Sequence, residues 1–112
     1  MKIVDRKSFL QLPKGTVYSK FMPYEFWGFS IKISDPEEDG NEWVHIPLVD
    51  GFIKNNNHEI TIDNYDYFEF DLDCSVRDGL YEKDQLFAIY DKDDVMKLIA
   101  RLTYSFLEKD FN

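Results

Sequence analysis

Hydrophobic and polar residues alternate along several short segments of the chain, and this pattern predicts β-strands. In residues 26–34 every second side chain is hydrophobic, and this face, which includes Trp27, is expected to point into the core. Residues 44–49 alternate in the same way after an acidic loop, so the two segments predict an antiparallel hairpin. Pro47 has no N–H for a ladder, and the second strand is therefore expected to be an edge at that point.

The last third of the chain combines a buried strand with an amphipathic helix. Residues 86–90 form a short, continuous hydrophobic run, which is typical of a strand buried on both faces. An acidic turn follows, in which Asp93 or Asp94 can accept the first free amides of a helix. The helix is expected to cover one face of a sheet with a hydrophobic stripe. The stripe consists of Val95, Leu98, Ile99, Leu102 and Phe106, with Lys97, Arg101, Ser105 and Glu108 opposite.

The remaining patterns predict further strands and a short first helix. Residues 2–4 and 16–21 favour strands, Asp5 is a suitable cap for a helix ending at Leu12, and residues 68–72 alternate again. We therefore predict one domain over residues 1–112. Its fold class is α+β, with a mostly antiparallel sheet of about five strands. A short N-terminal helix and a longer C-terminal helix are packed on one face of this sheet.

The formal net charge of −9, from 22 acidic and 13 basic residues, narrows the classes of partner. It disfavours direct binding to nucleic acid or to an anionic membrane surface. It favours a soluble protein, with a basic partner or mimicry of nucleic-acid charge as alternatives. The N-terminus lacks the apolar core of a signal peptide and no segment has membrane-spanning length, so we expect a cytoplasmic protein.

No motif indicates a metal, a cofactor or an enzymatic activity. The single cysteine, Cys74, excludes an internal disulfide, and neither His45 nor His58 has a partner at metal-ligand spacing. His45 is expected on the outer face of its strand. Residues 71–82 place oxygen-bearing side chains as a calcium loop does, but Val76 stands where that loop needs glycine. Because phosphate loops and nucleophile motifs are also absent, we expect a non-enzymatic protein without a cofactor.

One short span is both basic and aromatic within this acidic chain, and it includes Trp27. Such a patch suits a phosphate-bearing ligand whose base stacks on a ring. The alternative is that these are ordinary strand residues with lysines at the rim. The candidate ligand-binding residues are Lys14, Tyr18, Lys20, Tyr24 and Lys32.

Residues 1–20 and 77–102 resemble small acidic proteins of unassigned function from bacteriophage genomes. The resemblance implies an accessory factor in the host cytoplasm that acts on a host protein, including proteins of host immunity. It implies no catalytic or binding residue.

Two functions are therefore expected as alternatives, a binding protein for a host protein and a protein that sequesters a small anionic, nucleotide-type ligand. A metal-dependent hydrolase built on converging carboxylates is a third. Because an edge strand needs protection, we also expect a homo-oligomer.

Overall fold

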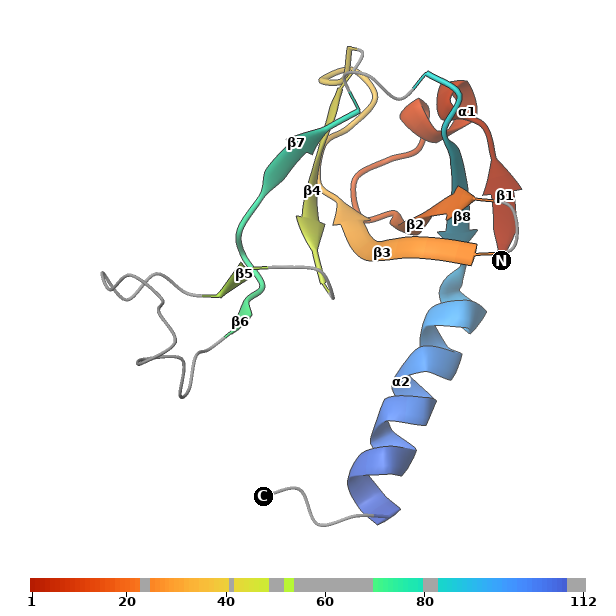
Figure 1. Cartoon of the computed structure of the whole chain (residues 1–112), viewed down its shortest axis with the longest axis vertical. Helices are drawn as coiled ribbons and strands as arrows, with labels where there is room; N and C mark the ends of the chain where they lie inside the picture. The colour runs from red at the N-terminus through yellow and green to blue at the C-terminus, as the bar shows by residue number, and fades with distance from the viewer. Residues whose placement is uncertain (23–24, 41, 49–51, 54–69, 80–82, 109–112) are drawn as a thin grey trace.

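The computed structural model describes residues 1–22, 25–40, 42–48, 52–53, 70–79 and 83–108. Its centre is a six-stranded antiparallel sheet with the strand order β1-β8-β2-β3-β4-β7, and β5 and β6 form a separate pair (Figure 1). The strands are β1 (Lys2–Val4), β2 (Val17–Met22), β3 (Glu25–Lys32), β4 (Trp43–Pro47), β5 (Phe52–Ile53), β6 (Phe70–Asp71), β7 (Val76–Asp78) and β8 (Leu86–Tyr90). The helices are α1 (Arg6–Leu10) and α2 (Lys92–Glu108). The predicted α+β class, with a short first helix and a longer last one, is confirmed.

Helix α1 covers one face of the sheet and closes the core there. Asp5 caps the helix as predicted, because its carboxylate accepts the backbone N–H of Ser8 at 2.8 Å. The helix buries Phe9, whose ring stacks on Phe87 at a centroid distance of 4.0 Å. The rings of Tyr18 and Trp43 meet Phe9 edge to face, and the four aromatic side chains form the core cluster.

A β-bulge between β2 and β3 separates Trp27 from the rest of the predicted hydrophobic face, which includes Ile31 and lies on the side of the sheet opposite Tyr18 and the core cluster. Tyr18 pairs with Ser30, but Lys20 pairs with Trp27, so β3 has one residue more than β2 across this interval. Gly28, at φ 72°, supplies the left-handed conformation found in one class of bulge. The extra residue exchanges the faces of β3, because side chains alternate with a period of two. Trp27 therefore shares the face of Lys20, near the edge of the core, and is 56% exposed.

The edges of the sheet are β1 and β7, so β4 is an interior strand. At Pro47 itself β4 nevertheless has the unpaired side that was predicted, because the described pairing of β4 with β7 ends at His45. Leu48 donates its N–H to the carbonyl oxygen of Phe29 at 2.7 Å, so the nitrogen of Pro47 faces the side away from β3. Both true edges are strands of three residues, and short edges offer little template for pairing.

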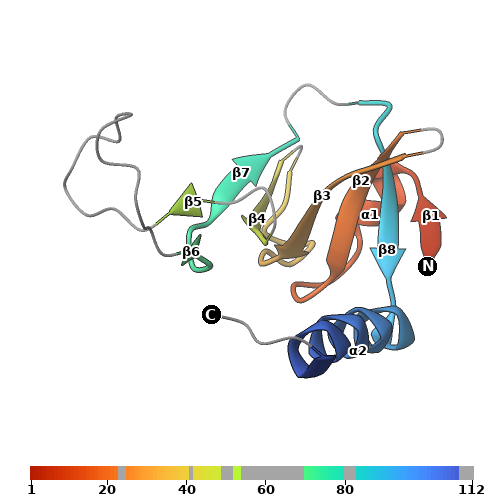
Figure 2. The ribbon, with the colours of Figure 1, turned by 60° about the horizontal axis from the view of Figure 1, so that its bottom comes forward.

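Helix α2 leaves the end of β8 and extends away from the sheet (Figures 1 and 2). The prediction that its hydrophobic stripe covers the sheet is wrong, because Leu98, Ile99 and Leu102 are 40%, 50% and 72% exposed. The sheet face that α1 does not cover is likewise only partly closed, and Ile3 and Leu86 are exposed there. Among the described residues, neither helix combines the length and apolar character needed to cross a bilayer.

Candidate functional site

The described residues of the predicted basic-aromatic patch do not form one surface. Lys32 is fully buried, and its ammonium group donates to the carbonyl oxygens of Leu12 and Ser34, each at 2.8 Å, and to Asp39 Oδ2 at 2.5 Å. A lysine has three N–H donors, so these contacts leave none for a ligand. Lys14 is exposed in the turn before β2, where its backbone N–H donates to an Asp35 carboxylate oxygen at 3.0 Å.

The described aromatic member of the patch, Tyr18, does not supply a stacking platform. The phenol of Tyr18 is 2% exposed, and its oxygen accepts the indole N–H of Trp43 at 2.8 Å. Tyr24 lies outside the described residues. Tyr18 and Lys20 do line a common hollow of about 200 Å³, together with the exposed Trp27. That volume is below the range of about 300–1,000 Å³ that is usual for small-molecule sites.

Ser30, His45 and Asp78, which are far apart in the chain, lie next to one another along this hollow. His45 Nδ1 lies 3.1 Å from the hydroxyl of Ser30, and His45 Nε2 lies 3.7 Å from Asp78 Oδ2. The imidazole is half-buried on the same face as Trp43, so the predicted position of His45 on the outer face is wrong. Burial lowers the pKa of His45; the carboxylate of Asp78 raises it in part, and the ammonium of Lys20 lowers it further. The neutral imidazole is therefore favoured near pH 7.

The same three groups are poorly arranged for nucleophilic catalysis. The 3.7 Å separation between His45 and Asp78 exceeds a hydrogen bond, and Asp78 instead pairs with the Lys20 ammonium at 3.0 Å. Ser30 is 7% exposed in the middle of a strand, where its pairing with Tyr18 and Pro47 commits the backbone to the sheet. A nucleophile needs room for the scissile group and free donors for the developing charge. The polar side chains of this hollow are therefore better explained as the border of the hydrophobic core than as a catalytic site.

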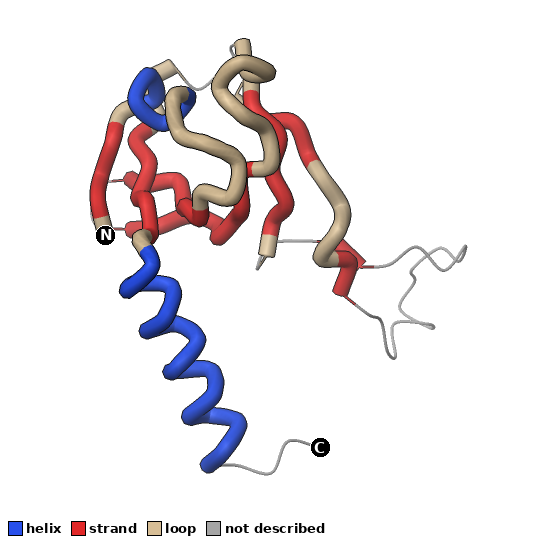
Figure 3. Tube along the Cα trace, turned by 180° about the vertical axis from the view of Figure 1, so that it is seen from behind, coloured by secondary structure: helices blue, strands red, loops and turns tan. Residues whose placement is uncertain are grey.

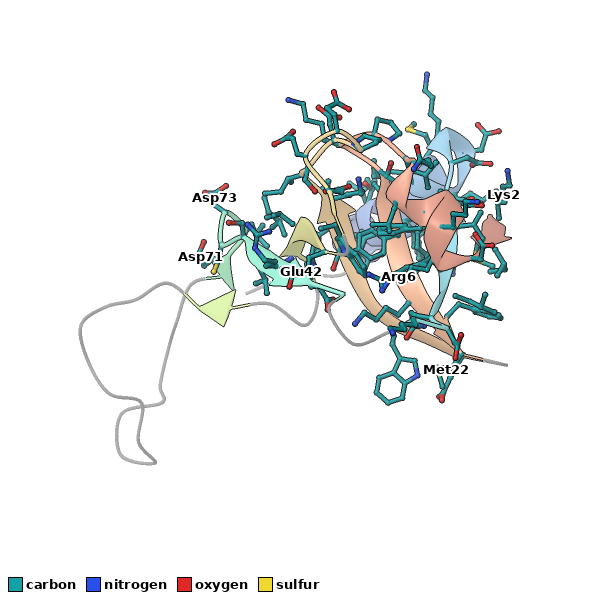
Figure 4. The ribbon with its side chains drawn as sticks, turned by 90° about the horizontal axis from the view of Figure 1, so that it is seen from above. Lys2, Arg6, Met22, Glu42, Asp71 and Asp73 are labelled. Atoms are coloured by element: carbon teal, nitrogen blue, oxygen red, sulfur yellow. The ribbon has the colours of Figure 1, made fainter. Side chains whose placement is uncertain are left out.

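The segment with calcium-loop spacing forms a turn between two strands. Asp71 ends β6 and accepts the backbone N–H of Asp73 at 3.0 Å, whereas Val76 begins β7 and pairs with β4. Figure 4 shows Asp71 and Asp73 at the end of the molecule opposite Lys2. Glu82, the last oxygen donor of the spacing, lies outside the described residues. Within the described part of the chain, no three histidine, cysteine or acidic side chains come together at a metal-binding separation.

The largest uncovered apolar surface among the described helices is one face of α2. On a helical projection of 100° per residue, its hydrophobic side chains span about half of the circumference. The polar side is formed by Lys97, Arg101 and Tyr104. A hollow lined by Lys97, Ala100, Arg101 and Tyr104 lies on this polar side and not on the apolar one. The exposed members of the apolar face are Met96, Leu98, Ile99, Leu102 and Leu107.

Comparisons with protein-family models, with curated proteins and with solved structures found no match. The functional argument consequently rests on the described residues themselves. The sequence located the hydrophobic stripe of α2 correctly, but it did not predict that this stripe is left uncovered.

Proposed function

We propose that this chain is a non-enzymatic binding protein that contacts another protein through the apolar face of α2. The observation that carries this proposal is the exposure of this apolar face, which reaches 72% at Leu102 and 74% at Leu107. Monomeric proteins rarely leave contiguous hydrophobic patches in water, and such patches mark interaction surfaces. An amphipathic helix typically places residues at this spacing into a hydrophobic groove of its partner.

The distribution of charge favours a basic partner protein over a second copy. The positive and negative formal charges within α2 cancel, so the net charge of −9 is carried by the rest of the molecule. A groove with basic residues at its rim is attracted to this acidic body, whereas a second copy is repelled by it. The charged residues of α2 are Lys92, Lys97 and Arg101 against Asp93, Asp94 and Glu108.

The biological setting of the proposal follows from the resemblance of the two ends of the chain to phage proteins. In that setting the partner is a host protein in the cytoplasm, and a protein of host defence is the case the resemblance suggests. Binding by α2 does not depend on this setting. A helix that blocks a functional groove needs no chemistry of its own, which agrees with a chain that carries no recognised catalytic motif.

Two matched pairs of alanine substitutions test the role of α2. Ile99→Ala combined with Leu102→Ala removes hydrophobic anchors, and Lys97→Ala combined with Arg101→Ala removes charged groups from the other side. Anchors in an interface typically contribute more than about 1 kcal/mol each, so the first pair is expected to weaken binding by about tenfold or more. The measurement is quantitative capture from lysate of the producing cell, at low and at high salt.

The proposal requires proteins that wild type and the Lys97/Arg101 variant retain and the Ile99/Leu102 variant loses. Their capture should also weaken at high salt, because the long-range attraction is screened. Capture that is equal for both variants refutes a role for the apolar face. Sedimentation of the purified protein at micromolar concentration tests the competing occupant. A dimer that Ile99→Ala/Leu102→Ala dissociates shows that a second copy covers this face.

A further inference from the structure

A buried ion pair lies where β3 ends and the chain turns toward β4. The ammonium nitrogen of Lys32 is 2.5 Å from Asp39 Oδ2, and the two side chains are 0% and 2% exposed. Figure 3 shows α1 beside loops at the same end of the sheet. The aromatic core reaches the pair, because Lys32 Nζ lies 5.9 Å from the centre of the Phe9 ring. An amine and a carboxyl group are therefore held in contact where bulk water does not reach.

The hydrogen bonds of Lys32 orient its nitrogen toward Asp39. Besides its contact with Asp39, the nitrogen donates to the carbonyl oxygens of Leu12 and Ser34, each at 2.8 Å. An ammonium group has three N–H donors, whereas a neutral amine has two donors and one lone pair. When the proton on the Asp39 side passes to Oδ2, both carbonyl groups keep their donors. The lone pair that this transfer creates faces the carboxyl group of Asp39.

The carboxyl group of Asp39 is fixed in position but is not fully satisfied. Its loop is held by two hydrogen bonds, from the Asp39 N–H to the Pro36 carbonyl oxygen at 3.2 Å and from the Lys14 N–H to an Asp35 carboxylate oxygen at 3.0 Å. Within the described structure, nothing donates a hydrogen bond to the buried Asp39 Oδ1. A buried carboxylate oxygen without a donor costs more free energy than an amide oxygen, because a charged group loses more hydration. Conversion of this group to an amide reduces that cost.

We propose that Lys32 and Asp39 react with each other to form an amide bond between their side chains. The ion pair is the state before the reaction. A proton moves from Nζ to Oδ2, the Nζ lone pair attacks Cγ, and the Cγ–Oδ2 bond breaks. Oδ2 leaves as water with this proton and a second proton from Nζ. The balance is the loss of one water molecule, and no oxidant, cofactor or further reactant takes part.

Position and burial both favour this reaction over the same reaction in water. Reacting groups that are held in a geometry suitable for attack reach effective concentrations of about 10⁵–10⁸ M. In the core, the neutral amine and carboxylic acid lie closer in free energy to the ion pair than they do in water, because the two charges have lost their hydration. The same burial keeps bulk water from the product and so opposes hydrolysis of the amide.

Mass spectrometry of the wild-type protein, denatured after purification and after overnight incubation in the folded state, tests the proposal. The intact mass is expected to be lower than that of the sequence by one water molecule. Trypsin is expected not to cleave after Lys32, because its amine is part of an amide. One peptide should therefore span residues 21–54, again without one water molecule. Its fragmentation should give no sequence ions between residues 32 and 39. A folded wild-type protein that keeps the full mass of the sequence overturns the proposal.

A succinimide at Asp39 and Gly40 also releases one water molecule and has to be distinguished. Its formation leaves Lys32 open to trypsin, so a mass loss with normal cleavage after Lys32 likewise overturns the proposal. Gly40→Ala hinders the succinimide and places its Cβ in open space, so this variant is expected to keep the cross-link. Asp39→Asn should lose ammonia instead of water, and Lys32→Met should lose neither. Wild type kept in urea should retain the full mass, because the reaction needs the fold; an equal loss in urea contradicts this mechanism.

Discussion

Replacement of Gly79 by alanine places a methyl group inside the core. A Cβ atom at this position lies 2.1 Å from Trp43 Cζ3 and 2.6 Å from Cε3, and the indole is fully buried and unable to move aside freely. The backbone adds a second penalty, because Gly79 has φ +103°. The carbonyl oxygen of Gly79 also holds the Arg6 guanidinium, so a shift of this turn disturbs both the core and α1.

Two other glycines separate the contributions to the cost. Gly15 has φ +93° with nothing within 4 Å, and Gly40 has neither a positive φ nor a close neighbour. A left-handed backbone costs an alanine about 1–2 kcal/mol, and the lower entropy of the unfolded chain returns about 0.4–1 kcal/mol. Overpacking adds about 1–3 kcal/mol. We expect Gly40→Ala to be neutral or slightly stabilising, Gly15→Ala to cost about 1 kcal/mol, and Gly79→Ala to cost about 2–4 kcal/mol.

Urea unfolding followed by circular dichroism measures the three variants under identical conditions. A small domain has about 5–15 kcal/mol of stability, so the expected loss at Gly79 is readily resolved. The order Gly79→Ala, Gly15→Ala, Gly40→Ala from least to most stable supports the contact with Trp43. A Gly79→Ala midpoint equal to that of Gly15→Ala refutes it, because only the backbone penalty would then remain.

Four further substitutions probe the core, α2 and the hollow beside β4. Phe9→Ala is expected to cost about 3–5 kcal/mol in urea unfolding, because the ring is fully buried; a loss below about 1 kcal/mol contradicts the core as described. Leu102→Ala and Arg101→Ala are each expected to cost less than about 0.5 kcal/mol, and a loss of about 2 kcal/mol for Leu102→Ala alone would show that α2 packs on the protein in solution. Because the pKa of His45 is lowered by burial, the unfolded chain binds more protons, and stability falls as pH drops below about 6.5. Unfolding midpoints at pH 7.5 and 5.5 should differ less in His45→Gln than in wild type, and equal differences exclude this contribution.

Local sequence determined the elements themselves. Asp5 specified the start of α1, because a carboxylate at that place satisfies the free amide of Ser8 regardless of the rest of the fold. The hydrophobic run ending at Tyr90 and the helical spacing after Asp94 likewise predicted β8 and α2, since both patterns depend on neighbours within a few residues. The antiparallel hairpin of β3 and β4 follows from the same kind of pattern.

Tertiary structure decided which side of each element is covered. The bulge at Gly28 moved Trp27 to the other face, and a period-two pattern contains no information on a residue inserted against the partner strand. Lys32 became a core residue because three acceptors, contributed by the turn before β2 and by the loop after β3, surround its ammonium group. The stripe of α2 stayed uncovered because amphipathicity specifies that a hydrophobic face will be buried, but not whether the surface that buries it belongs to the same chain.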